Sequence, residues 1–228
     1  MLFTIRKVLL RSLVTLCVGL VVVTLAIWWS IHRDLAAVRR VIWQHPTPEY
    51  PRLVSGAFVA AEDPDFFEHS RFYTLDGVFQ MLRGSTATRD ASLTNQIVKN
   101  HVPIHRSVRR VWAEVLTSII LDASTSKEAI LRAYLNCVYL GTTDRTQVIG
   151  VQAASQGYLH KSPTALTPYE CARLAAAVRS PRRFSPIDDS ASVIARRLTV
   201  LDRMYTARQL SREQLSEARR IARSAASK

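Results

Sequence analysis

Glu62 and Asp63 stand at the end of an apolar run and open an acidic, aromatic turn that reaches His69. A glutamate in this position could act as a general base, because burial against apolar groups beside a second carboxylate raises a carboxyl pKa toward neutral pH. The alternative is that the adjacent acids cap a helix or face the solvent. His69 could be a ligand or an acid, but no second His or Cys lies at metal-ligand spacing, which favours a role in positioning the turn.

Cationic side chains gather further along the chain. Arg106, Arg110 and Glu114 recur at every fourth position opposite an apolar stripe, so a helix would place them on one side. The cations Lys99, Arg106, Arg109 and Arg110 lie within a dozen residues and would suit a phosphate or pyrophosphate, because guanidinium groups bind phosphate oxygens bidentately and lysine supplies a point charge. The alternative is a solvated helix face with weak ion pairs.

Hydroxyl and amide side chains fill the stretch before this cluster, namely Ser92, Thr94, Gln96 and Asn100. These groups could bind a sugar. Alternatively, Ser92 caps a helix and the two amides form its polar face.

The N-terminal part predicts a membrane anchor that would hold these groups near a bilayer. Ser12 to Ile31 contains no charged residue and includes Trp28 and Trp29 near its end, and a helix of this length rises about 30 Å, one hydrocarbon thickness. A cleaved signal peptide would have a shorter apolar region followed by a small-x-small site, which the sequence lacks there. We expect a cytoplasmic tail over 1–11 and a transmembrane helix over 12–31.

A basic connector is expected over 32–52, where Pro46, Pro48 and Pro51 argue against one continuous helix. Positive residues flank the span on both sides, so the charge rule alone does not orient it. The short tail before the span favours a signal anchor with the C-terminal domain outside the cytoplasm.

The remaining residues, 53–228, predict an all-α domain, because helical periodicity runs through them without a convincing alternating strand pattern. Two capping boxes support this, one from Thr167 to Glu170 and one from Ser211 to Gln214. The expected helices follow apolar stripes over 108–120, over 130–138 with Gly141 as the stop, over 168–178, over 192–205 and after 211, with a mobile loop over 84–91.

Charge and cysteine content narrow the function classes. The net charge is +13, which favours anionic partners such as lipid head groups or pyrophosphates. Nucleic acid is disfavoured because its recognition motifs are absent. Cys17 lies in the span, whereas Cys137 and Cys171 are either small buried apolar residues or, outside the cytoplasm, a disulfide.

Four blocks in order resemble the peptidoglycan glycosyltransferases, glycosyltransferase family 51, whose lysozyme-like domains occur in class A penicillin-binding proteins and in monofunctional transglycosylases. The resemblance covers roughly Val54 to Tyr205, and with one span and no second domain the chain looks most like a monofunctional biosynthetic transglycosylase. The blocks are Glu62-Asp63-x-x-Phe66-x-x-His69, then Ser92 to Gln96 with Val98-Lys99-Asn100, then Arg110-x-x-x-Glu114, and Lys127-x-x-Ile130-Leu131-x-x-Tyr134-Leu135-Asn136-x-x-Tyr139-x-Gly141.

Several positions depart from the family pattern. Val111 replaces an expected lysine beside Arg110, which puts part of the pyrophosphate site in doubt. The other departures are Arg71, Tyr73, Arg89, Asp90, Ala91 and Asn95, with one residue deleted between Lys99 and Arg106.

The resemblance implies that lipid II is polymerised into glycan strands with inversion and release of undecaprenyl pyrophosphate. Glu62 would be the general base, and Glu114 would orient the cations or assist at the leaving group. The resemblance leaves open whether a divalent cation, Mg²⁺ or Mn²⁺, also binds the pyrophosphate. The residues implied to bind substrate are Asp63, Phe66, His69, Ser92, Thr94, Gln96, Lys99, Asn100, Arg106 and Arg110.

The resemblance also implies a location and partners. The protein would be a single-pass protein of a bacterial inner membrane with its catalytic domain in the periplasm, meeting lipid II, the growing glycan strand, membrane lipids and cell-wall synthesis proteins. Two alternatives stay open: a catalytically weakened homologue that binds lipid II or scaffolds cell-wall synthesis, and a lysozyme-like lytic glycosidase.

Overall fold

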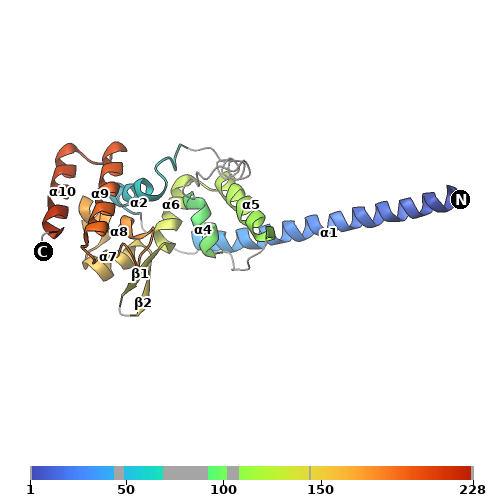
Figure 1. Cartoon of the computed structure of the whole chain (residues 1–228), viewed down its shortest axis with the longest axis horizontal. Coiled ribbons are helices and arrows are strands. Elements are labelled where there is room, and N and C mark those ends of the chain that lie inside the picture. The colour runs from blue at the N-terminus through green and yellow to red at the C-terminus, as the bar shows by residue number, and fades with distance from the viewer. Residues whose placement is uncertain (1, 44–48, 69–91, 102–107, 144, 227–228) are drawn as a thin grey trace.

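The computed structural model describes residues 2–43, 49–68, 92–101, 108–143 and 145–226, and helices dominate these ranges (Figure 1). This confirms the predicted all-α class. The elements are α1 (Leu2–Trp43), α2 (Arg52–Glu62), α4 (Leu93–His101), α5 (Val108–Ser124), α6 (Lys127–Cys137), β1 (Tyr139–Thr143), β2 (Thr146–Ile149), α7 (Val151–Leu159), a 3-10 turn (Pro163–Ala165), α8 (Pro168–Ala177), α9 (Ala191–Thr206) and α10 (Arg212–Ala226).

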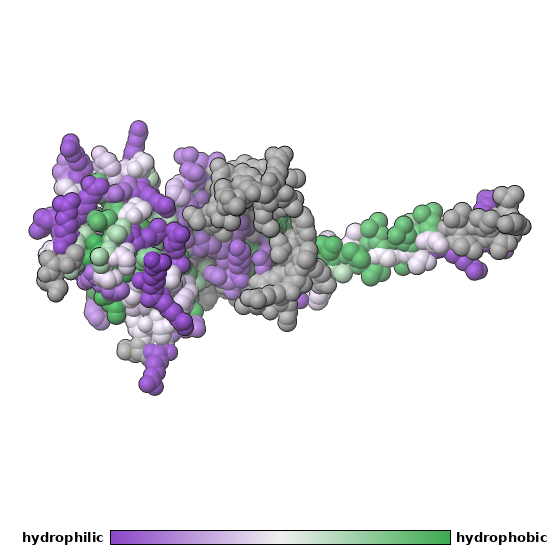
Figure 2. All heavy atoms as spheres, in the orientation of Figure 1, coloured by the Kyte–Doolittle hydropathy of each residue, from purple (hydrophilic) through white to green (hydrophobic). Residues whose placement is uncertain are grey.

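Helix α1 projects from the domain (Figure 1), and the visible face of its middle part is largely hydrophobic (Figure 2). The large hydrophobic side chains of this part, from Leu10 to Trp29, are exposed. The stretch Leu10–Arg40 is long and apolar enough to cross a membrane. The helix does not end near residue 31 as expected. It continues to Trp43, because the breaking prolines begin only at Pro46.

The inner part of α1 belongs to the domain. Ser30, Asp34, Leu35 and Val38 are buried and lie on one side of the helix, which packs against α4, α5 and α6. Asp34 Oδ1 accepts hydrogen bonds from Nε and Nη2 of the neighbouring Arg33, at 3.1 and 3.0 Å. The expected connector is therefore, over 32–43, a docked helix.

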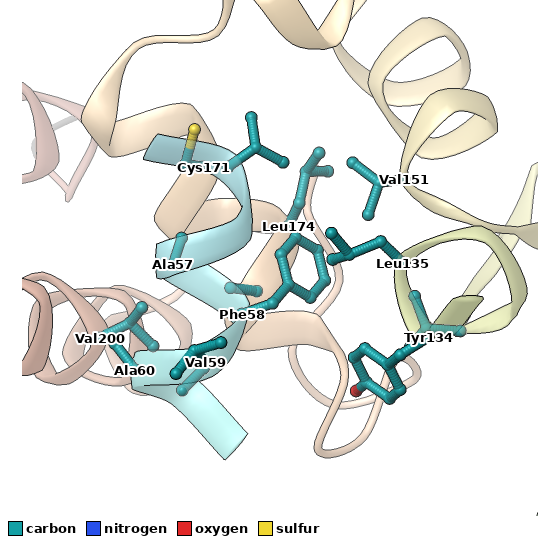
Figure 3. Close-up of a cluster of buried hydrophobic side chains, with 14 of the residues drawn as sticks. Ala57, Phe58, Val59, Ala60, Tyr134, Leu135, Val151, Cys171, Leu174 and Val200 are labelled. Carbon is teal, nitrogen blue, oxygen red and sulfur yellow. The ribbon is translucent and has the colours of Figure 1, made fainter. Parts of the chain in front are cut away.

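Helix α2 is the centre of the core. Ala57, Phe58, Ala60 and Ala61 are at most 2% exposed, and the small alanines let α8 and α9 approach closely. Figure 3 shows Phe58 lying between Leu174 of α8 and Leu135 of α6. Because α2 is packed on several sides, its last residue, Glu62, is held in a fixed position.

Helix α6 leads into a hairpin that the sequence pattern did not predict. Its N-cap is Ser126, whose hydroxyl accepts from the backbone N–H of Ala129, and it ends at Cys137 rather than at Gly141. The strands β1 and β2 pair antiparallel, with an irregular register between Tyr139 and Gly141. That bulge breaks the two-residue alternation by which strands are recognised.

Gly141 has a role different from the predicted helix stop. Its φ is 119°, and a Cβ there would lie 2.5 Å from the Tyr158 hydroxyl oxygen. That hydroxyl donates to the carbonyl of Leu140 at 3.1 Å. Glycine is needed so that β1 can pass closely over α7.

The C-terminal helices follow the sequence prediction. Thr167 and Glu170 form the expected capping box, and α8 ends at Ala177. Ser211 and Gln214 exchange the two equivalent hydrogen bonds at the start of α10. Helix α9, over Ala191–Thr206, agrees with the expected stripe over 192–205.

The cysteines are free rather than bridged. Cys171 is buried and Cys137 partly so, and burial raises the pKa of each thiol to about 12. Both therefore behave as small apolar residues at neutral pH.

Candidate active site

Glu62 lies at the C-terminal end of α2 with its side chain 12% exposed. Its Oε2 accepts a hydrogen bond from Nε2 of Gln96 on α4 at 3.3 Å. Its Oε1 lies 3.7 Å from Nη2 of Arg196 on α9, whose side chain is 10% exposed. The structure thus brings together Glu62 and Gln96, both predicted from the sequence, and adds Arg196, which was not.

Two arginines of α9 also hold the backbone that carries Glu62. Arg203 Nη1 donates to the carbonyl of Ala61 at 2.9 Å, and Arg196 Nη2 donates to the same carbonyl at 3.4 Å. The last carbonyls of a helix have no intrahelical partner and carry a partial negative charge, so two cations stabilise this end of α2. Their spacing of seven residues on a predicted helix was the available sequence signal.

Tyr134 of α6 extends the hydrogen-bond chain behind Gln96. Its hydroxyl donates to Gln96 Oε1 at 3.2 Å, which leaves the Gln96 amide nitrogen directed at Glu62. Burial, and secondarily the negative charge of Glu62, raises the pKa of Tyr134 well above its ordinary value. Tyr134 therefore stays protonated and remains a donor throughout the working pH range.

Asp63 has a structural contact in this fold. It is the C-cap of α2 and is 5% exposed. Its Oδ2 accepts from the backbone N–H of Leu93 at 3.3 Å, at the N-terminus of α4, where a negative charge is favourable. This contact fixes α4 relative to α2, and a direct contact of Asp63 with substrate stays a prediction.

Thr94 and Phe66 are also buried, and their contact with substrate stays a prediction. Thr94 donates to Oδ1 of Asp122 at 2.8 Å, and Lys127 Nζ lies 3.2 Å from the same oxygen. The Lys127 ammonium also lies 4.7 Å from the centroid of the Phe66 ring. These four side chains join α4, α5 and α6 to the turn after Glu62. Asp122, within an apolar run, was the signal that the sequence analysis overlooked.

Ser92 precedes α4, as expected of a cap, but its hydroxyl makes no capping hydrogen bond. Among the described residues its buried Oγ has no hydrogen-bond partner, while Asp63 Oδ2 accepts from the first N–H of the helix. Its predicted contact with a sugar stays untested.

Lys99 and Asn100 are exposed on α4. They lie three and four residues after Gln96, so they continue the helix face that meets Glu62. Glu114 lies on α5 and is half-buried, and its backbone carbonyl accepts from Ser118 Oγ at 2.8 Å.

Part of the predicted cation site lies outside the described residues. His69, Arg106 and the loop over 84–91 fall there, as do the departures Arg71, Tyr73, Arg89, Asp90 and Ala91. The backbone of Arg110 and Val111 is in α5, but their side chains are not described.

A metal site was also left open by the sequence. Among the described residues, no group of three His, Cys, Asp or Glu side chains could hold a metal ion. A divalent cation at the pyrophosphate therefore stays a prediction, and no catalytic step is assigned to it.

The chain is similar to known proteins over most of the helical domain. Penicillin-binding protein 1B of Haemophilus influenzae is 32% identical over 174 residues, 74% of this chain and 22% of that protein. Penicillin-binding protein 1A of Escherichia coli is 31% identical over 175 residues, 74% of this chain and 20% of that protein. Penicillin-binding protein 1F of Bacillus subtilis is 35% identical over 161 residues, 68% of this chain and 22% of that protein.

The chain therefore spans about a fifth of the length of these relatives. A family model described as "Transglycosylase" matches residues 34–205, a range that includes Glu62, Gln96, Tyr134 and Arg196. The resemblance read from the four sequence blocks is thus confirmed. The chain belongs to the transglycosylase family.

Proposed function

We propose that the protein is a peptidoglycan glycosyltransferase that polymerises lipid II into glycan strands. The observation that carries this proposal is the setting of Glu62, a nearly buried carboxylate at the end of the central helix, held by Gln96 and Arg196. Membership of the transglycosylase family supports the reaction class.

In the proposed step, Glu62 removes the proton from the 4-hydroxyl of an incoming lipid II. The hydroxyl oxygen forms a bond to the anomeric carbon of the growing strand with inversion, and the bond from that carbon to the pyrophosphate oxygen breaks. The pyrophosphate takes the electron pair. Arg196 Nη2 lies 3.7 Å from Glu62 Oε1 and places a positive charge beside it. Gln96 orients it for the proton transfer.

Cations are needed at the leaving group. Lys99, Arg106 and Arg110 are the residues proposed to stabilise the departing pyrophosphate, with Glu114 orienting them. The exposure of Lys99 on the same face of α4 as Gln96 supports this assignment. These cations would thus bind the negative charge that develops on undecaprenyl pyrophosphate and separate it from the carboxylate of Glu62.

The membrane helix suits a lipid substrate. Because both the donor and the acceptor are embedded in the bilayer, an anchored enzyme meets them at a raised effective concentration. We propose that the protein is single-pass in a bacterial inner membrane, with its catalytic domain in the periplasm, and that it works with cell-wall synthesis proteins.

Glu62→Gln tests the proposal. The full-length protein in liposomes should polymerise lipid II, and the variant should lose about 10²- to 10⁴-fold in rate, the usual contribution of a general base. The measurement is polymer length and amount after gel separation. Glu217→Gln, an exposed change on α10, should polymerise at the wild-type rate.

Other outcomes would favour the alternatives. Wild-type polymerisation by Glu62→Gln would remove Glu62 as the base. Binding of lipid II without any polymer from the wild-type protein would indicate a non-catalytic homologue. Release of soluble fragments from finished peptidoglycan would indicate a lytic glycosidase.

A further inference from the structure

A cleft of about 890 Å³ lies beside α2 and has no part in the steps above. Ligand pockets of this size accommodate molecules as large as a drug or a short peptide. One wall is the face of α2 from Arg52 to Val59, and another is the face of α6 from Glu128 to Leu135. The end of α9 and the turn over 64–68 complete it. Among the described residues, none of those that line it comes from α4.

The charges of the cleft differ from those of the whole chain. The chain carries +13, yet among the described residues that line the cleft the acidic side chains outnumber the basic ones, so this part of the lining does not favour a polyanion such as a pyrophosphate. The basic residues are Arg52, Arg132 and Arg203, and the acidic ones are Glu49, Asp65, Glu68 and Glu128.

Most of these charged groups are available to a ligand. Arg203 is used in holding the carbonyl of Ala61. Within the described part of the chain, the side chains of Arg52, Arg132 and the four acids form no ion pair or hydrogen bond. Arg132 and Glu128 lie four residues apart on α6 without pairing, so each can meet an opposite charge on a ligand.

The apolar part of the lining suits short side chains between those charges. Val59, Leu131 and Leu135 form a floor from α2 and α6, and Phe67 contributes a ring that is 52% exposed. A ligand that fits this lining has carboxylates, an ammonium group and small apolar groups in one extended molecule. A short zwitterionic peptide has this chemistry.

We propose that the cleft binds the stem peptide of peptidoglycan, the pentapeptide carried by lipid II and by the growing strand. This rests on the proposed function. The turn that lines the cleft, Pro64 to Glu68, begins two residues after Glu62, so the cleft lies next to the end of α2 that carries Glu62. The peptide carboxylates meet Arg52 and Arg132, and the ammonium group of its diamino residue meets Glu128 or Asp65.

The direct test is a titration of the full-length protein in detergent with the free pentapeptide L-Ala-γ-D-Glu-L-Lys-D-Ala-D-Ala, followed by calorimetry. Arg132→Gln and Arg52→Gln should each weaken binding about tenfold or more, because each removes a charged hydrogen-bond donor. Arg223→Gln, the same change at an exposed site on α10, should bind as the wild type does.

Several results would overturn the assignment. These are no binding at millimolar peptide, equal binding by both cleft variants and the control, or equally tight binding of an all-L peptide of the same charge. The titration needs no turnover. If the protein makes no polymer but the peptide result holds, the proposed function fails and the cleft assignment stands.

Turnover supplies a second readout. Arg132→Gln should raise KM for lipid II with little change in kcat, because it removes binding energy that does not change in the transition state. Lipid-linked disaccharide without a peptide should show the same rise in KM with the wild-type protein. Equal use of both substrates by the wild type would contradict the proposal.

Discussion

Glu62 carries its negative charge at the end of a helix that is itself partly negative. A carboxylate at a helix C-terminus is unfavourable, because the last carbonyls carry about half a negative charge. Arg196 and Arg203 offset this by lying against the same carbonyls. The carboxylate of Glu62 thus lies between the partial negative charge of the helix end and the positive charges of the two arginines.

Replacing Arg196 should alter the pH dependence of the reaction. Among the described residues, the groups that face Glu62 or its backbone include Gln96, Tyr134, Arg196 and Arg203. In Arg196→Gln the protonated carboxyl persists to higher pH, so the acidic limb of kcat/KM should move to higher pH. Arg196→Lys should restore most of the wild-type profile. An unchanged limb in Arg196→Gln would show that Arg196 does not act on Glu62.

Tyr134→Phe should reduce turnover through Gln96. The hydroxyl that donates to Gln96 Oε1 is lost, so Gln96 is free to rotate away from Glu62. We expect kcat to fall about tenfold, while the free energy of unfolding falls by about 1 kcal/mol, the usual worth of one hydrogen bond. Tyr158→Phe removes a comparable hydroxyl contact with Leu140. Tyr158→Phe should lower the free energy of unfolding by a similar amount and leave kcat unchanged. Equal losses of kcat in the two variants would contradict a role of Tyr134 in holding Gln96.

At the scale of elements, most of the long helices were predictable from the sequence, whereas the short hairpin and the extension of α1 beyond the span were not. Apolar stripes located α5, α6, α8 and α9 because each helix buries one face. The hairpin was missed because a bulge at Tyr139 to Gly141 breaks its alternation. The extension of α1 to Trp43 was not predicted, because the apolar pattern marks only the length that can cross a membrane and not the residue at which the helix ends.

The contribution of Glu170 to the stability of the fold, at the start of α8, depends on pH. Burial alone would raise its pKa, but hydrogen bonds from Lys161 and Thr167 outweigh burial and lower the pKa below the ordinary value of 4.5. A lowered carboxyl pKa stabilises the fold above the ordinary value and loses that contribution as pH falls through the folded value. Glu170→Gln should therefore unfold at lower urea than the wild type at pH 7, and the difference should shrink below about pH 4. A constant difference would contradict this role.

For the whole molecule, the candidate site is assembled from α2, α4, α6 and α9. Glu62 and Gln96 were identified from local blocks in the sequence. Arg196 was not, because no local pattern connects it to a residue so distant along the chain. Thr94 and Phe66 were assigned to substrate from their blocks, yet both are buried by neighbours that only the folded structure brings together.

The docking of α1 can be measured by matched leucine substitutions. Leu35 is 5% exposed against the domain, whereas Leu25 on the same helix is 58% exposed. In detergent, Leu35→Ala should lower the free energy of unfolding by about 2–5 kcal/mol, as for other buried leucines. Leu25→Ala should change it by less than about 0.5 kcal/mol. Equal effects would mean that the inner part of α1 does not pack on the domain.

The unbroken course of α1 gives the protein a mechanical property. In the proposed membrane topology, α1 crosses the bilayer and continues without a break into the domain, so the height and tilt of Glu62 relative to the lipid follow the tilt of the span. Spans tilt to match bilayer thickness. If the proposed function holds, the rate of polymerisation should therefore vary with the acyl length of the surrounding lipids, so that the activity depends on the thickness of the membrane.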